Sequence, residues 1–193
     1  MPSLDLDIDI RPLTPARRAD WLDFFEQRAF TDNPKWAFCY CHFPHADHAT
    51  IVWKERTPAE NRRASCDGID SGALRGWLAY VEGRPIGWCN AGPRAAIDGM
   101  FDAPEPDAAT IGAIVCFVVA PEFRGRGVAT RLLRAACDGL REQGFTWAEA
   151  YPRTDAASAA AHHFGPRAMF EAAGFAVHAD DGDDGLKMRL KLA

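Results

Sequence analysis

An apolar run that leads into a glycine-rich turn and then a helix constrains the fold more than any other feature of the sequence. Residues 114–119 are all apolar, which predicts a buried strand, and Pro121 ends it because proline has no N–H to donate. Apolar residues then recur with helical spacing from Val128, and Gly144 is placed to end that helix. This arrangement is typical of an anion site, because the first N–H groups of a helix have no internal acceptors. The sequence therefore predicts a pyrophosphate-binding turn before Val128.

The spacing of the glycines separates the ligand classes that use such a turn. A phosphate-binding P-loop needs two glycines five residues apart followed by Lys and Ser or Thr, and that pattern is absent here. A dinucleotide-binding turn needs Gly-x-Gly-x-x-Gly, which Gly125 and Gly127 satisfy but Thr130 does not. Glu149 stands where such a turn would place its ribose-binding acid. A dinucleotide-dependent oxidoreductase therefore remains an alternative.

Three motifs in the second half of the chain carry a resemblance to a known family. The run Arg124-Gly125-Arg126-Gly127-Val128-Ala129 resembles Arg/Gln-x-x-Gly-x-Gly/Ala, the coenzyme A pyrophosphate loop of the GNAT superfamily of N-acetyltransferases. Before it, residues 119–121 resemble the Val-x-Pro that ends the central strand of that family. After it, residues 168–175 resemble the closing helix and its Gly-Phe step. The resemblance covers about residues 76–192.

A second resemblance reaches the first half of the chain. Residues 36–41, 61–63, 87–89 and 115–117 are similar to a bacterial GNAT subgroup with an N-terminal Cys-x-Cys segment, here Cys39 and Cys41. That subgroup implies no particular substrate.

The superfamily resemblance implies a fold and a reaction. We expect one α/β (α+β) domain over residues 1–193, with a mixed, mostly antiparallel sheet that is splayed at its central parallel strand pair and flanked by helices. The reaction implied is direct transfer of acetyl from acetyl-CoA, the cosubstrate, to a primary amine of a small molecule or protein, without a covalent enzyme intermediate. The resemblance is compatible with a homodimer. A GNAT fold that binds coenzyme A without turnover is the second hypothesis.

The resemblance also assigns site residues. The main chain of Phe117, Val118 and Val119 would bind pantetheine, with the Val118 N–H stabilising the tetrahedral oxyanion. The pyrophosphate and its surroundings would be bound by Arg124, Gly125, Arg126, Gly127, Val128, Ala129, Thr130 and His163.

The groups that move protons are less clear from the sequence. Many members of the family use a tyrosine in the last helix as the acid, but Phe170 stands at that position. Glu149 and Tyr151 alternate on one face of the strand predicted over residues 147–152, so they are the first candidates for base and acid. A salt-bridged carboxylate and a packed aromatic ring are the structural alternatives. His162, beside the His163 named above, is a further candidate base, whereas Cys116 reads as a buried apolar thiol.

Residues 33–48 are rich in aromatic side chains, cysteine and histidine. Cys39, Cys41 and three histidines suggest zinc, but the Cys-x-Cys spacing is too short and no second cysteine pair follows, so no metal is predicted. If residues 36–43 are extended, both thiols face the same side. A buried strand or loop is the favoured interpretation, and a lining of the acceptor pocket is the alternative.

Composition excludes some classes of function. The chain is 48% hydrophobic and 25% charged with a net charge of −5, which disfavours binding to nucleic acid. No apolar run is long enough for a membrane span, and the acidic N-terminus lacks the features of a signal peptide. We therefore expect a cytoplasmic protein with reduced thiols.

The other elements follow from local signals. Thr57-Pro58-Ala59-Glu60 predicts a capped helix ending at Gly72, with residues 61–63 on its solvated face. Further expectations are a strand at 4–10, a helix from Thr14 and Pro15 to about residue 30, a hairpin at 77–82 and 86–90, a loop at 95–109, a helix at 166–173 and a strand pair at 175–178 and 186–192.

Overall fold

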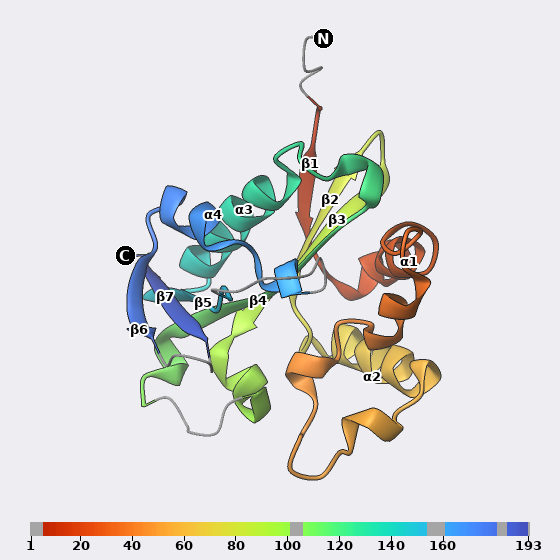
Figure 1. Cartoon of the computed structure of the whole chain (residues 1–193), viewed down its shortest axis with the longest axis horizontal. Helices are drawn as coiled ribbons and strands as arrows, with labels where there is room; N and C mark the ends of the chain where they lie inside the picture. Colours follow the sequence, from red (N-terminus) through yellow and green to blue (C-terminus); the bar gives the residue numbers. More distant parts are fainter. Residues whose placement is uncertain (1–5, 101–105, 154–160, 181–184, 193) are drawn as a thin grey trace.

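One seven-stranded sheet forms the centre of the computed structural model (Figure 1), which describes residues 6–100, 106–153, 161–180 and 185–192. The strand order is β1-β2-β3-β4-β5-β7-β6, and β4 and β5 are its parallel pair. All other neighbours are antiparallel. The expected fold class, a mostly antiparallel mixed sheet flanked by helices, is therefore confirmed.

The strands agree well with the expectations from the sequence. They are β1 (Asp9–Pro12), β2 (Gly76–Val81), β3 (Arg84–Pro93), β4 (Ile111–Val119), β5 (Trp147–Ala150), β6 (Ala176–Asp180) and β7 (Leu186–Lys191). One detail differs. The predicted strand at 4–10 is found only from Asp9, where pairing with Tyr80 of β2 starts, and residues 4 and 5 lie outside the described residues. The last strand, β7, lies between β5 and β6, so the C-terminal pair extends the sheet through β7.

In the part of the chain that the structure describes, four α-helices cover the sheet, and shorter helical turns join them. The α-helices are α1 (Arg18–Asp23), α2 (Pro58–Ser71), α3 (Val128–Glu142) and α4 (Arg167–Ala172). The turns are η1 (Pro15–Arg17), η2 (Phe24–Arg28), η3 (Pro34–Cys39), η4 (Phe43–His45), η5 (Trp53–Glu55), η6 (Arg94–Met100), η7 (Ala108–Thr110), η8 (Pro121–Phe123) and η9 (Ala161–Phe164).

Local signals set the ends of the long helices. The Thr57 hydroxyl accepts a hydrogen bond from the Glu60 N–H at 3.3 Å, and the Glu60 carboxylate accepts one from the Thr57 N–H at 2.7 Å. This is the predicted capping box, and Gly72 ends α2 in a left-handed conformation with φ 74°. Thr14, in contrast, makes no capping hydrogen bond before η1.

The two faces of the sheet carry separate hydrophobic cores. Helices α3 and α4 lie on one face, and α1 and α2 lie on the other (Figure 1). On the α3 face, Gly139 allows close packing, since a Cβ there would lie 2.2 Å from Cζ2 of Trp77. On the other face, Trp21 meets Trp88 of β3 edge to face, with ring centroids 6.2 Å apart. Burial of each large apolar side chain contributes about 1.5–3 kcal/mol.

Of the strand or loop favoured for the segment around Cys39 and Cys41, the structure shows a loop built from helical turns, so residues 36–43 are not extended. Pro34 opens the 3-10 helix η3, and Tyr40 and Cys41 then adopt left-handed conformations with φ 44° and 52° before η4. Proline at the first helical position favours such turns over a strand. The predicted loop at 95–109 also contains η6 and η7, and its residues 101–105 lie outside the described residues, as do 154–160 and 181–184.

Candidate active site

The sheet opens beside the second half of β4. Strand β4 pairs with β5 only from Ile111 to Ile114, but it stays paired with β3 as far as Val119. Within the described residues, 115–119 therefore have a strand neighbour on one side only. The main chain on their other side is available to a ligand that adds to the sheet edge.

Alternation along β4 decides which main-chain groups face this opening. The Ala120 N–H donates to the Ile86 carbonyl of β3 at 3.0 Å, so the groups of Val118 also point toward β3. The main-chain N–H and C=O groups of Phe117 and Val119 point away from β3. In agreement, the Val119 carbonyl accepts a hydrogen bond from Arg124 Nε at 3.0 Å. This register is at odds with the expectation that the Val118 N–H meets the ligand, because that N–H faces β3.

The glycine turn after β4 adopts the conformation that its sequence predicts. Gly125 and Gly127 have φ 71° and 78°, in the left-handed region that glycine tolerates, and a Cβ at either position would meet nothing within 4 Å. The glycines are therefore required by backbone angle rather than by space. Gly127 is the N-cap of α3 and makes no side-chain cap, so the N–H groups of Val128, Ala129 and Thr130 have no acceptor within the helix.

Arg124 links this turn to the other side of the site. Its guanidinium contacts the Asp32 carboxylate through two nitrogens, at 2.6 and 3.3 Å. The hydrogen bond from Arg124 lowers the pKa of Asp32. Nearby, the Arg126 guanidinium lies 6.0 Å from the centre of the Phe123 ring. The turn is thus rich in positive charge and exposed to solvent.

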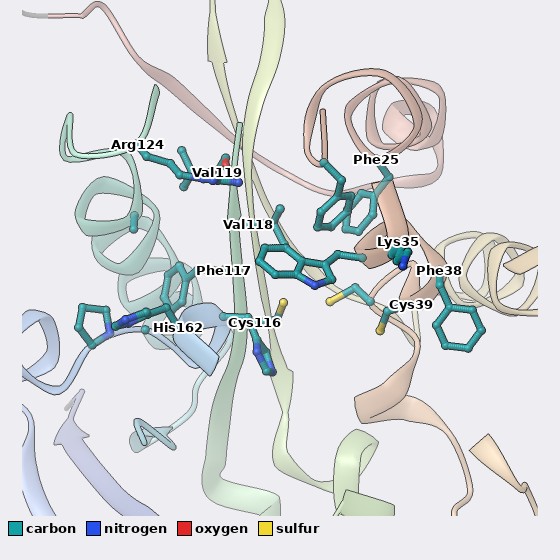
Figure 2. A pocket seen from close by; sticks show the side chains of 17 residues that line it. Phe25, Lys35, Phe38, Cys39, Cys116, Phe117, Val118, Val119, Arg124 and His162 are labelled. Carbon is teal, nitrogen blue, oxygen red and sulfur yellow. Dashed lines mark hydrogen bonds between the residues drawn. The ribbon is translucent and has the colours of Figure 1, made fainter. Parts of the chain in front are cut away.

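A cavity of about 560 Å³ lies between the open edge of β4 and the η3 segment (Figure 2). It is bounded by β4, the glycine turn and η9 on one side and by η2 and η3 on the other. Its lining residues are Phe25, Phe30, Lys35, Trp36, Phe38, Cys39, Cys41, Cys116, Phe117, Val118, Val119, Arg124, Ala129, His162, His163, Gly165 and Pro166. The wall is mainly apolar and aromatic, and the charged side chains within this lining are cationic.

Helix α2 fixes the η3 wall through two buried polar side chains. Asn61 Nδ2 donates to the Phe38 carbonyl at 3.0 Å, and Ser65 Oγ donates to the Tyr40 carbonyl at 2.8 Å. Both side chains are fully buried. Asn61 was expected on the solvated face of α2, and this is wrong, since it faces the loop instead. A buried Asn among exposed arginines gives no periodic signal in the sequence.

Stacked rings support the same wall. Trp21 stacks on Phe25 with centroids 4.3 Å apart, and Phe25 stacks on Tyr40 at 6.2 Å. The sequence analysis did not assign Phe25 or Lys35 to the site, because neither belongs to a motif. Only the folded position of η2 and η3 brings them to the cavity.

Comparisons with known proteins bear on this geometry. A model of the Acetyltransferase (GNAT) family matches residues 17–175. That match spans most of the chain. The chain belongs to the GNAT acetyltransferase family. No significant match was found among curated proteins.

Solved structures share the GNAT fold. An N-acetyltransferase from Staphylococcus aureus Mu50 superposes with a TM-score of 0.58 at 15% identity, covering 97% of this chain and 99% of that one. YncA from Salmonella typhimurium, solved with acetyl-CoA, has a TM-score of 0.53 at 16% identity and coverages of 96% and 94%. PaiA N-acetyltransferase from Thermoplasma acidophilum, solved with coenzyme A, gives 0.55 at 13% identity and coverages of 96% and 99%.

Phe170, at the position of the GNAT tyrosine, is fully buried in α4. Its ring lies 6.2 Å from the Phe117 ring and 5.3 Å from the Phe175 ring, measured between centroids. This side chain packs in the core and has no proton to donate.

Glu149 and Tyr151 lie together but away from the cavity. The Tyr151 hydroxyl donates to Glu149 Oε1, while Arg189 Nε lies 2.6 Å from Oε2 and Arg94 Nε lies 3.5 Å from Oε1. Glu149 pairs with Ala113 of β4, five positions before Val118, which corresponds to about 16 Å along the strand. Burial and the neighbouring carboxylate raise the pKa of Tyr151 well above its ordinary value.

The described residues therefore divide the expected site residues in two. Phe117, Val118, Val119, Arg124, Ala129 and His163 line one cavity, with the other turn residues directly beside it. Glu149 and Tyr151 belong to a separate buried network. No helix among the described residues is long and apolar enough to cross a membrane. The described residues also contain no cluster of three or more His, Cys, Asp or Glu side chains that could hold a metal ion.

Proposed function

We propose that this GNAT protein transfers the acetyl group of acetyl-CoA to a primary amine by direct attack. One observation carries the proposal: β4 keeps an unpaired edge over residues 115–119 and runs directly into the glycine turn and the start of α3. That edge fits an extended amide chain such as pantetheine, and the turn fits its pyrophosphate. The neighbours solved with acetyl-CoA and coenzyme A support the same cosubstrate.

The direction of the chain fixes the direction of the cosubstrate. Because the glycine turn follows Val119, the pyrophosphate end lies near Val119 and the acetyl end lies farther back along β4. The first free N–H on that path, behind Val119, belongs to Phe117. We assign the oxyanion contact to this N–H in place of that of Val118, whose N–H faces β3. One such donor contributes about 3 kcal/mol to the transition state.

Proton transfer falls to side chains in the cavity. His162 lines it and is the kind of residue most often used as a general base. The departing thiolate needs no dedicated acid, because an unperturbed thiol has a pKa of about 8.5. Glu149 and Tyr151 then have a structural role, since their network is buried and separate.

The acceptor would enter from the side of η2 and η3. The amine must reach the acetyl carbonyl near Phe117, and the aromatic wall of the cavity leads there. A small molecule or a protein could supply this amine. We further propose that the protein is cytoplasmic, forms a homodimer and belongs to the Cys-x-Cys subgroup.

Thermal unfolding with acetyl-CoA, coenzyme A and NADH in parallel tests the cosubstrate. A ligand at about 100 times its Kd stabilises by about 2.7 kcal/mol, which is about 5–10 °C for a domain of this size. We expect a shift with both coenzyme A species and none with NADH. Gly127→Glu should abolish the shift. Gly144→Glu is the matched control, because Gly144 also has a left-handed φ, 87°, and open space around it, but lies at the other end of α3.

The same assay separates the alternatives. A shift with NADH alone would overturn the acetyltransferase proposal in favour of a dinucleotide enzyme. A shift with acetyl-CoA but no turnover across a broad panel of amines would favour a non-catalytic coenzyme A-binding module, for which the absence of a hydroxyl at Phe170 is the supporting observation.

A further inference from the structure

Two thiols meet at the cavity wall and have no role in the proposed acetyl transfer. Cys41, from the segment after η3, and Cys116, from β4, both line the cavity. Cys41 and Cys116 pack in the same buried cluster, and Asn90 of β3, whose Nδ2 lies 3.2 Å from Cys41 Sγ, is the direct strand neighbour of Cys116. Figure 2 shows the Cys116 sulfur turned from β4 toward the segment that carries Cys39. Residues 75 positions apart in the sequence thus form one pair.

A buried amide stabilises the sulfur of Cys41. Asn90 Nδ2 lies 3.2 Å from Cys41 Sγ and 3.0 Å from His45 Nε2. Asn90 is only 2% exposed. The amide nitrogen therefore lies between His45 and Cys41, and one of its N–H groups donates to the Cys41 sulfur. Such donors stabilise a thiolate more than a thiol.

The backbone holds Cys41 in an unusual position. Tyr40 and Cys41 are consecutive non-glycine residues with positive φ, 44° and 52°, a conformation that is unfavourable for residues with a Cβ. The hydrogen bond from Ser65 to the Tyr40 carbonyl maintains this conformation from α2. Strained positions of this kind persist where the surroundings fix them, and they concentrate at functional sites.

The six cysteines of the chain differ in their tendency to ionise. Burial alone would raise the pKa of Cys41, but its polar neighbours, first Cys116 and then Trp88 and Asn90, outweigh burial and lower that pKa. The other titratable groups around Cys41 are Cys39 on its own segment, Cys89 on β3 and, through Asn90, His45. Burial raises the pKa of Cys39 to about 12 and that of Cys89 well above its ordinary value. The neighbouring Cys41, followed by burial, raises the pKa of Cys116.

We propose that Cys41 and Cys116 form an oxidisable thiol pair, in which a hydroperoxide converts Cys41 to a sulfenic acid that Cys116 then closes to a disulfide. In the first step the Cys41 thiolate attacks the peroxide, the O–O bond breaks, and an alcohol or water leaves after taking up a proton. In the second step Cys116 attacks the Cys41 sulfur, an S–S bond forms, the S–O bond breaks, and water leaves. The two thiols supply the two electrons that reduce the peroxide.

The consequence for catalysis rests on the proposed function. The pair lies where the acceptor amine would approach the acetyl group, whereas the glycine turn lies at the other end of the cavity. Oxidation would therefore block acetyl transfer and leave acetyl-CoA binding intact. The thiol chemistry itself does not depend on the proposed activity.

The test treats the native protein with hydrogen peroxide, blocks the remaining thiols with iodoacetamide after denaturation, and maps the peptides by mass spectrometry. Of the six free thiols, two should be lost together, and a link should join the tryptic peptides that contain Cys41 and Cys116. Cys39 shares a tryptic peptide with Cys41, so Cys39→Ser is the matched control and should form the same link. Cys41→Ser should form none, and Cys116→Ser should stop at a sulfenic acid that dimedone traps.

Two results would overturn the pair. The first is that both thiols of the wild-type protein still react with iodoacetamide at a peroxide concentration at which dimedone traps the sulfenic acid in Cys116→Ser. The other is a link that persists in Cys41→Ser. The thermal shift with acetyl-CoA, measured before and after oxidation, separates the two proposals. If the disulfide forms but acetyl-CoA shifts the melting temperature neither before nor after oxidation, only the proposed function is refuted. If acetyl-CoA shifts the melting temperature but no disulfide forms, only the thiol pair is refuted.

Discussion

Arg189 and Glu149 form a buried ion pair, with Nε 2.6 Å from Oε2, across the β5–β7 ladder in which the two residues are direct neighbours. Glu149 is 0% exposed, and the buried guanidinium of Arg94 lies 3.5 Å from its other oxygen. The carboxylate thus compensates two cations from β7 and η6. Both oxygens of this carboxylate therefore have partners inside the fold.

Glu149→Gln should therefore destabilise the fold strongly while leaving the chemistry possible. Removing the charge takes away the carboxylate that both buried arginines share, and breaking a buried ion pair typically costs about 3–5 kcal/mol. We expect the melting temperature to fall by about 10 °C, with the acetyl-CoA shift retained at low temperature. Arg189→Met should be destabilising in the same way. A Glu149→Gln protein with unchanged stability but no turnover would contradict the structural role and restore Glu149 as the base.

Local signals made part of this structure predictable. The Thr57 capping box, the strand at 111–119 and the glycine turn each depend on residues close together in sequence, and each was predicted correctly. The segment around Cys41 was not, because its left-handed residues are held by α2 and β3. The pairing of Glu149 with Arg189 likewise depends on β7 lying beside β5, which no local pattern encodes.

Substitutions of Arg124 and of its partner Asp32 should have different effects on the affinity for coenzyme A. Arg124→Gln removes a charged donor from the turn, and a charge-assisted hydrogen bond contributes about 1.5–3 kcal/mol, so Kd should rise at least about tenfold. Asp32→Asn removes the partner that holds the guanidinium at 2.6 Å, so Kd should stay the same or fall. Isothermal titration calorimetry measures both. Weaker binding in Asp32→Asn would mean that the ion pair positions Arg124 for the ligand rather than competing with it.

Asn61 should matter for stability and for the acceptor wall. In Asn61→Ala, the Phe38 carbonyl loses its 3.0 Å hydrogen bond, and a buried group left unsatisfied costs about 1–3 kcal/mol. Urea denaturation should show this loss, and the acetyl-CoA shift should persist because β4 is unaffected. Arg63→Ala, two positions along the exposed face of the same helix, is the matched control and should stay within about 0.5 kcal/mol of wild type. Equal stability of the two variants would refute the anchoring role of Asn61.

Mild acid should destabilise the segment that carries the thiols. Burial, with a smaller contribution from Arg56, lowers the pKa of His42 to about 4, and burial also lowers the pKa of His45. Between about pH 6.5 and pH 4 the unfolded chain therefore binds protons that the folded chain excludes, so the free energy of unfolding falls as the pH falls through this range. The melting temperature should drop between about pH 7.5 and pH 5, and His42→Gln should reduce that drop. His178→Gln, on the exposed strand β6, should follow the wild type. A drop that His42→Gln leaves unchanged would show that other groups cause the acid sensitivity.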